Sequence, residues 1–287
     1  MLGATLAALA AVAAAGVAVT DDLGHRLTLE RHPSRIVSIA PGSTEMLVAA
    51  GAGKRVLATV ESSVDPPEAL RVPRIGDAHA IDMERLVSLR PEIVVAWPGG
   101  NSAAQIAKIE RLGIPLYRQR VDRLADLPAS LRRLGVLAGT QDVADEAAAT
   151  LGVRLAKLEE RHASGPRLSV LLQVWDRPVY TVGGTQLMSD ALRVCGGDNV
   201  FGDLRDLGPA VEIEAVIARD PAMIIAVGPD AATAEWLDAW KRFDSMRAVR
   251  TNRLIAFGDM RLSRLGPGVI DATEALCGAI DRARSMQ

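Results

Sequence analysis

The chain has 287 residues, of which 49% are hydrophobic and 24% are charged, and its formal net charge at pH 7 is −2. This length can bury a sizeable core and is enough for two small lobes. The near-neutral charge argues against attraction to nucleic-acid phosphates, so we expect no nucleic-acid partner. Aromatic residues make up only 3% of the chain, so each Trp and Tyr needs a role in packing or in ligand binding.

Residues 1–19 contain no charged side chain and consist mostly of Ala, Leu, Val and Gly. This composition predicts the apolar region and cleavage zone of a signal peptide, and therefore an exported protein. No Lys or Arg precedes the stretch, so an uncleaved membrane anchor is the alternative. Because an Ala-dominated segment is weakly apolar for a membrane span, the signal peptide is favoured.

Cys195 and Cys277 are the only two cysteines of the chain. In an exported protein an even number of cysteines usually indicates a disulfide, while two buried free thiols are the alternative.

Beyond residue 35, short β-branched runs alternate with segments of helical periodicity, which predicts the α/β class with parallel strands and crossover helices. The first series offers strands at 36–40, 56–60, 93–97 and 116–118, with a helix that opens at Ser43 or Thr44 and closes at Gly51. The second series offers strands at 168–175, 223–227 and 254–257, and helices near 189–194, 233–243 and 269–283.

Between the two series, residues 142–163 form a stretch rich in Ala, Leu, Glu, Arg and Lys that ends before Ser164-Gly165-Pro166. It predicts one long helix, on the order of 30 Å at 1.5 Å per residue. We therefore expect an N-terminal α/β lobe at 20–141, a linking helix at 142–163 and a C-terminal α/β lobe at 164–287.

A weak internal repeat relates the two lobes. The segment IDMERLV at 81–87 leads through Pro91 to IVVA at 93–96, and VEIEAVI at 211–217 leads through Pro221 to MIIA at 223–226. In each copy an acidic helix start precedes a proline and a buried strand, which predicts lobes of common origin and a two-lobed molecule with approximate twofold symmetry.

The motifs of common α/β enzymes are missing from the sequence. The first strand is followed by PGST at 41–44, which is neither a dinucleotide fingerprint nor a phosphate loop, and there is no GxSxG elbow. The four histidines, His25, His32, His79 and His162, show no metal-site spacing. We therefore expect no enzyme, no catalytic residues, no metal site and no catalytic cofactor, although His79 follows Gly76-Asp77 in a loop that could face a ligand.

Two glutamates and two aromatic residues are candidates for binding. Glu84 and Glu214 occupy equivalent places in the repeat; each could simply favour its helix dipole, or the pair could dock onto a symmetric partner with two basic sites. Trp97 ends a buried strand at the sheet edge where ligands bind in open α/β folds, or it caps the core. Tyr180 comes shortly after the strand at 168–175 and faces the same cleft, or belongs to the core or rim.

Four segments together resemble the periplasmic cobalamin-binding proteins of ABC importers, a family within the class III substrate-binding protein superfamily, and the similarity runs from about residue 20 to the end. The segments are RIVSIAPGSTE at 35–45, the stretch from Glu84 to AWPGGN at 96–101, VCGGDNVF at 194–201 and LC at 276–277. The first segment is also typical of ferric-siderophore and haem receptors of the superfamily.

The resemblance implies two Rossmann-like lobes joined by one rigid helix, with a corrinoid, cobalamin above the others, held in the cleft as transported ligand. It implies a disulfide between Cys195 and Cys277, and it implies that Glu84 and Glu214 meet arginines of two permease subunits in the cytoplasmic membrane. It also implies a monomer in the periplasm. The implied ligand contacts are Trp97, Tyr180, Asp259 and Arg264.

The sequence departs from the family where Ser62, Ala78 and Gly208 replace further pocket aromatics, and the loop from Asp259 to Arg264 is one residue longer. A roomier pocket is expected, in which Trp175 compensates from a neighbouring position. The alternatives are another corrinoid such as cobinamide, haem, or a ferric siderophore; for haem, His79 is the candidate ligand in the first lobe.

Overall fold

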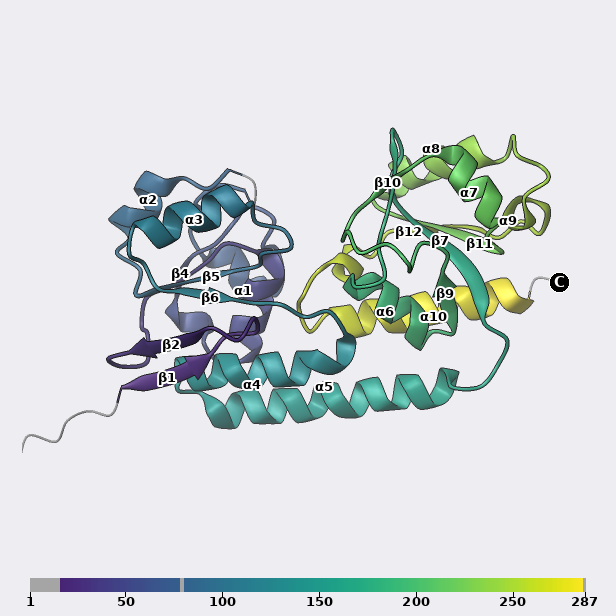
Figure 1. Cartoon of the computed structure of the whole chain (residues 1–287). Coiled ribbons are helices and arrows are strands. Elements are labelled where there is room, and N and C mark those ends of the chain that lie inside the picture. The colour runs from purple at the N-terminus through teal and green to yellow at the C-terminus, as the bar shows by residue number, and fades with distance from the viewer. Residues whose placement is uncertain (1–15, 78–79, 286–287) are drawn as a thin grey trace, which may run out of the picture.

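The short apolar runs form two large, separate sheets in the computed structural model, which describes residues 16–77 and 80–285 (Figure 1). Each sheet carries helices on its faces, and the long helix α5 (Gln141–His162) joins the two lobes. The predicted class of two Rossmann-like lobes linked by one helix is confirmed. The linking helix lies within one residue of its predicted range at each end.

The N-terminal lobe contains a four-stranded parallel sheet in the order β4-β3-β5-β6. Strands β3 and β5 are buried along their whole length, as expected for parallel strands covered on both faces. The strands are β3 (Ile36–Ser38), β4 (Val56–Ala58), β5 (Ile93–Ala96) and β6 (Leu116–Arg118), and the helices are α1 (Pro41–Ala49), α2 (Met83–Ser88), α3 (Ala103–Arg111) and α4 (Leu127–Ala138).

Helix α1 begins at Pro41, and not at Ser43 or Thr44 as predicted. Proline suits the first helical turn because it lacks only an N–H group that the turn leaves unused. The hydroxyl of Thr44 is therefore not a cap; it is buried and donates to Ser38 Oγ at 2.8 Å. Strand β3 ends at Ser38, two residues before the predicted end, although the backbone N–H of Ile39 still donates to the Val95 carbonyl at 3.0 Å.

An antiparallel hairpin that the sequence did not predict precedes this sheet: β1 (Val17–Thr20) pairs with β2 (Arg26–Leu29) and packs on α4. The turn places Asp22 where its carboxylate accepts hydrogen bonds from Tyr117 at 2.9 Å and Ser130 at 2.6 Å. The predicted signal peptide at 1–19 lies mainly outside the described residues, but cleavage after residue 19 would remove most of β1. No helix in 16–77 or 80–285 combines the length and apolarity needed to cross a membrane.

The C-terminal lobe contains a six-stranded mixed sheet in which β10-β8-β7-β11-β12 form one path and β9 pairs with β7. Three strands have the predicted bounds: β7 (Leu168–Trp175), β11 (Met223–Val227) and β12 (Leu254–Phe257). The other elements are β8 (Val179–Thr181), β9 (Gly197–Asn199), β10 (Ala210–Val211), α6 (Leu187–Val194), α7 (Ile213–Arg219), α8 (Asp230–Trp240), α9 (Arg247–Arg250) and α10 (Val269–Ser285). Four short 3-10 helices complete the described chain: Gly53–Arg55, Pro67–Arg71, Leu124–Asp126 and Met260–Ser263.

The repeat is visible in the backbone as well as in the sequence. Helix α2 leads to β5 and helix α7 leads to β11, and the residue before each proline, Arg90 and Asp220, has a positive φ of 46° and 37°. Positive φ is uncommon for residues other than glycine. Because these two residues occupy the same place in the two repeats, the lobes share a backbone turn as well as an order of elements.

Polar contacts and one helix fix the lobes relative to each other. Asp190 of α6 accepts a hydrogen bond at 2.8 Å from the backbone N–H of Leu124 in the first lobe. Arg154 of α5 pairs with Asp271 of α10. Helix α5 itself packs on α4 in one lobe and on α6 and α10 in the other.

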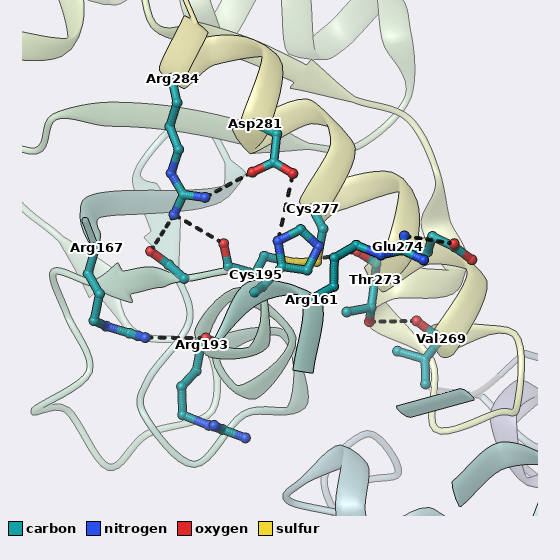
Figure 2. Close-up of a disulfide and its surroundings, with 12 residues drawn as sticks. Arg161, Arg167, Arg193, Cys195, Val269, Thr273, Glu274, Cys277, Asp281 and Arg284 are labelled. Carbon is teal, nitrogen blue, oxygen red and sulfur yellow. Dashed lines mark hydrogen bonds and ion pairs between the residues drawn. A yellow bond between two sulfur atoms is a disulfide. The ribbon is translucent and has the colours of Figure 1, made fainter. Parts of the chain in front are cut away.

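The predicted disulfide between Cys195 and Cys277 is confirmed; it ties the end of α6 to α10 (Figure 2). Both cysteines are buried, and Figure 2 shows Arg284 reaching from α10 to the Cys195 carbonyl, to which it donates at 3.3 Å. The bond closes a loop with a sequence separation of 82 residues.

Replacing both Cys195 and Cys277 by Ala should lower the free energy of unfolding by roughly 4 kcal/mol, because the unfolded chain regains the freedom of a long loop. Denaturant unfolding of the oxidised protein and the double variant measures this difference. Reductant should destabilise only the parent protein, so an equal response of both proteins would contradict the expectation.

Candidate ligand-binding cleft

Two adjoining cavities, of about 190 and 250 Å³, lie between the lobes. They share residues of both lobes in their walls, so they form one cleft. The first lobe contributes Leu23, Trp97, Pro98, Gly99, Arg120, Val121 and Asp122, and the second contributes Val174, Val182, Thr185, Gln186, Leu187, Met188, Arg205, Leu207, Gly208, Val227, Met260, Ser263 and Leu265.

Trp97 lines both cavities, and the residues after it explain how it is held. The backbone N–H of Trp97 donates to Asn101 Oδ1 at 2.9 Å, and the buried Asn101 amide donates to the Ile39 carbonyl at 2.8 Å. The indole lies against Gly99 and Gly100: a Cβ at Gly99 would come within 2.6 Å of Trp97 Nε1, and one at Gly100 would overlap the ring. The two glycines are therefore required for the indole to fold over its own loop.

The predicted aromatic contacts of the second lobe lie farther from these cavities. Trp175 on β7 and Tyr180 on β8 are opposite each other in register, and their exposed fractions are 58% and 37%. Trp175 packs against Trp236 with ring centroids 5.9 Å apart. Neither lines the two cavities, whereas Gly208 lines the larger one. Their contact with a ligand stays a prediction, as an extension of the cleft along the sheet edge.

The charged side chains of the loop before α10 form ion pairs with other side chains of the protein. Asp259 pairs with Arg261 at 2.7 Å. Arg264 contributes to a small cavity under Trp97, but its guanidinium extends to the first lobe, where Nη1 lies 2.8 Å from Asp65 Oδ2. The structure thus uses Arg264 as a bridge between the lobes at the floor of the cleft.

The remaining predicted contacts of the first lobe are Ser62, Ala78 and His79, of which the structure describes Ser62. Ser62 is exposed and lines neither cavity. Ala78 and His79 lie outside the described residues, so their predicted roles stay predictions. Among the described residues, no group of three or more His, Cys, Asp or Glu side chains is arranged to hold a metal ion.

Glu45 is the second partner of Arg264 and is almost completely buried, with an exposed fraction of 5%. Its Oε1 lies 3.5 Å from Arg264 Nη1 and makes no hydrogen bond. Burial raises the pKa of Glu45 from 4.5 to about 7, although the charge of Arg264 opposes the shift. The Glu45 carboxyl therefore gives up its proton at a higher pH than an ordinary glutamate does.

The two exposed glutamates of the repeat lie on α2 and α7. Glu84 is in the first turn of α2 and Glu214 in the first turn of α7. Both helices lie on the side of the molecule away from α4 and α5 (Figure 1). Each lobe therefore carries one of the two glutamates at the start of a helix on this side of the molecule.

Several residues of the cleft were missed from sequence, chiefly Arg120, Gln186, Arg205, Leu207 and Ser263. Four of them lie on loops or at a helix start, and Ser263 ends the short 3-10 helix Met260–Ser263, so no periodicity marks any of them. One sequence feature could have indicated the second-lobe loop: in Gly183-Gly184, a Cβ on either residue would overlap the backbone of residues 202–206. An adjacent glycine pair marks a close approach of two backbone segments.

The Glu45→Gln variant should be more stable than the parent protein at pH 8, by about 1 to 3 kcal/mol. The folded-state pKa of Glu45 lies above its ordinary value, so the folded protein binds this proton more tightly than the unfolded chain does, and stability falls as pH rises from about 4.5 to about 7. Glutamine removes that loss. Urea unfolding from pH 5 to pH 8 measures the effect.

The control is Glu68→Gln, because Glu45 and Glu68 line one further cavity, of about 460 Å³, and Glu68 is exposed. It should leave the pH profile unchanged. A loss of stability at pH 8 in the Glu45 variant would instead mean that Arg264 requires the ionised carboxylate.

Comparison with known proteins agrees with this architecture. The pattern of the family described as periplasmic binding protein matches residues 36–259. The vitamin B12-binding protein of Vibrio cholerae is 30% identical over 243 residues, which cover 85% of this chain and 87% of that protein, and the one of Vibrio campbellii is 33% identical over 206 residues, or 70% and 75% of the two chains.

Solved structures show the same arrangement. The crystal structure of the periplasmic vitamin B12 binding protein BtuF of Vibrio cholerae matches with a TM-score of 0.80 and 29% identity over 88% of this chain and 98% of that chain. A periplasmic heme-binding protein of Roseiflexus sp. RS-1 matches with a TM-score of 0.73 at 24% identity over 88% of this chain and 99% of that chain, and shares the fold. The two-lobed architecture, the cleft and the match over residues 36–259 lead to one conclusion: the chain belongs to the periplasmic binding protein family.

Proposed function

We propose that this protein captures a corrinoid in the cleft between its lobes and delivers it to the permease of an ABC importer. Cobalamin is the corrinoid that we favour. The observation that carries the proposal is the position of Trp97, whose aromatic side chain lines both cavities of the cleft and whose backbone N–H is held by Asn101 Oδ1. Support also comes from the relatives at 30% and 33% identity, whose names state that they bind vitamin B12.

The chemistry of the cleft suits a large ring with peripheral amides. Trp97, Leu187, Leu207 and Leu265 offer broad apolar contact, and Gln186 supplies a polar group at the start of α6. The enclosed volume holds only part of such a ring, so we expect its edge to extend out of the cleft toward Trp175 and Tyr180. An aromatic platform in a half-open cleft contributes both apolar area and stacking.

In this proposal the protein works as an exported carrier in the periplasm. It binds as a monomer, transports its ligand without chemistry and has two permease subunits as partners. The lobe contacts through α5 and Arg264 keep the cleft open without large hinge motion, so the ligand enters a preformed site. The alternatives within the same fold are a haem or ferric-siderophore carrier.

Calorimetric titration of the purified protein with cyanocobalamin, cobinamide and haemin tests the ligand. We expect cyanocobalamin to bind with a Kd below about 1 µM, equivalent to roughly 8 kcal/mol. Binding of haemin alone would overturn the corrinoid assignment and keep the carrier role.

Gly100→Ala should weaken cyanocobalamin binding by about tenfold or more, because the added methyl group displaces the Trp97 indole. The matched control is Gly152→Ala on α5, where a Cβ meets no other atom within 4 Å. Calorimetry compares the two variants with the parent protein. Equal affinities of all three proteins would show that the ligand does not use the Trp97 platform.

Replacing both Glu84 and Glu214 by Ala should change ligand affinity by less than about twofold. It should weaken binding to the permease by about tenfold or more, because two basic groups of the permease would each lose a carboxylate partner. Glu146 and Glu160 on α5 are exposed as well and form the control pair. Pull-down or surface binding to the permease in detergent measures the effect. Unchanged permease binding by the first pair would reject the docking role.

A further inference from the structure

Two arginines from opposite lobes line the smaller cavity of the cleft, and the proposed function has so far used neither. Arg120 follows β6 in the first lobe, and Arg205 lies on the loop between β9 and β10 in the second. The cavity lining contains one further charged residue, Asp122. Two positive charges and one negative charge leave a net charge of +1 in the lining.

The positive charge of Arg120 is balanced by a carboxylate of its own lobe. Its backbone N–H donates to Asp22 Oδ2 at 3.0 Å, and its Nε donates to the two oxygens of Asp122 at 2.8 and 2.9 Å. Because this guanidinium already has a carboxylate partner, the uncompensated charge of the cavity is that of Arg205.

The backbone around Arg205 is held on several sides. The N–H of Gly184 donates to the Leu204 carbonyl at 3.0 Å, and that of Gly183 donates to the Leu207 carbonyl at 3.4 Å. The Thr185 hydroxyl donates to the carbonyl of Arg205 itself at 3.4 Å. The loop is therefore positioned before any ligand binds.

The side chain of Arg205, by contrast, is exposed and makes no ion pair or side-chain hydrogen bond in 16–77 or 80–285. A cation on a fixed loop, at the edge of an apolar cavity, is arranged to bind an anion that arrives with an apolar ligand. Guanidinium groups bind phosphate and carboxylate through paired N–H donors, and such charge-assisted bonds are stronger than neutral ones.

We propose that Arg205 binds an anionic phosphate on the ligand, and that the cleft thereby prefers corrinoids with a phosphate-linked nucleotide loop over corrinoids that lack the phosphate. The inference rests on the proposed function. It adds a residue that determines specificity inside the corrinoid class. Carboxylates of a porphyrin have the same chemistry, so the experiment separates the two sources.

The test is calorimetric titration of the parent protein, Arg205→Gln and Arg282→Gln with cyanocobalamin, cobinamide phosphate and cobinamide. Arg282 is an exposed arginine on α10 and lines neither cavity, so its variant is a matched control. We expect Arg205→Gln to weaken the binding of cyanocobalamin and of cobinamide phosphate by about tenfold, or about 1.4 kcal/mol. The binding of cobinamide should weaken by less than about twofold. Arg282→Gln should leave all three affinities unchanged.

An equal loss for all three corrinoids, or no loss for any, would overturn the role of Arg205 and leave the proposed function intact. If the parent protein binds no corrinoid, the proposed function fails, and haemin and its dimethyl ester become the probes. If Arg205→Gln lowers the affinity for haemin tenfold and leaves the affinity for the dimethyl ester unchanged, Arg205 binds an anion, and that anion is a carboxylate. Equal affinity for the two haemins, or no binding, would overturn it.

Discussion

The apolar stripe along α5 is the constraint on which the two-lobed arrangement depends. Its buried residues recur at helical spacing, and they belong to one continuous apolar core that includes side chains from both sheets. The stripe consists of Ala144, Ala148, Leu151, Leu155 and Leu158. Because the same helix packs on α4 at one end and on α6 and α10 at the other, the distance between the lobes is set by close packing.

The cleft follows from this fixed spacing and from two glycine pairs. Gly99-Gly100 lets the Trp97 indole fold onto its loop in the first lobe, and Gly183-Gly184 lets residues 202–206 approach the start of α6 in the second. Each lobe therefore presents a loop whose backbone is held by hydrogen bonds, and the side chains on these loops differ in chemistry. The first lobe supplies the aromatic surface, and the second supplies the cation.

Much of the fold could be predicted from the sequence because buried parallel strands are nearly continuous apolar runs between breakers. The bounds of β7, β11 and β12 follow from such runs. The hairpin β1–β2 was missed because its first strand continues the apolar stretch at the start of the sequence without a break, and β8 and β10 are too short to show a period. The disulfide and the repeat were predictable, since cysteine count and a fixed offset are properties of the sequence itself.

The site was predictable only in part, for a physical reason. Trp97 could be found because it ends a strand at the edge where open sheets bind ligands. The bridge from Arg264 to Asp65 joins residues 199 positions apart, and no local pattern reveals a partner at that distance. Arg205 likewise lies on a loop without periodicity, and its position becomes meaningful only when the opposite lobe is in place.

The continuous core also determines how the molecule responds as a whole to its cargo. Each lobe has an apolar cluster of its own on one face of its sheet, but the largest cluster contains residues of both sheets and of α5. Local loosening of one lobe therefore exposes apolar surface of this shared cluster. A molecule bound in the cleft therefore stabilises the folded chain against melting, and the rise in melting temperature grows with the ratio of free ligand concentration to Kd. Thermal denaturation can thus rank candidate cargoes without any knowledge of which lobe they touch.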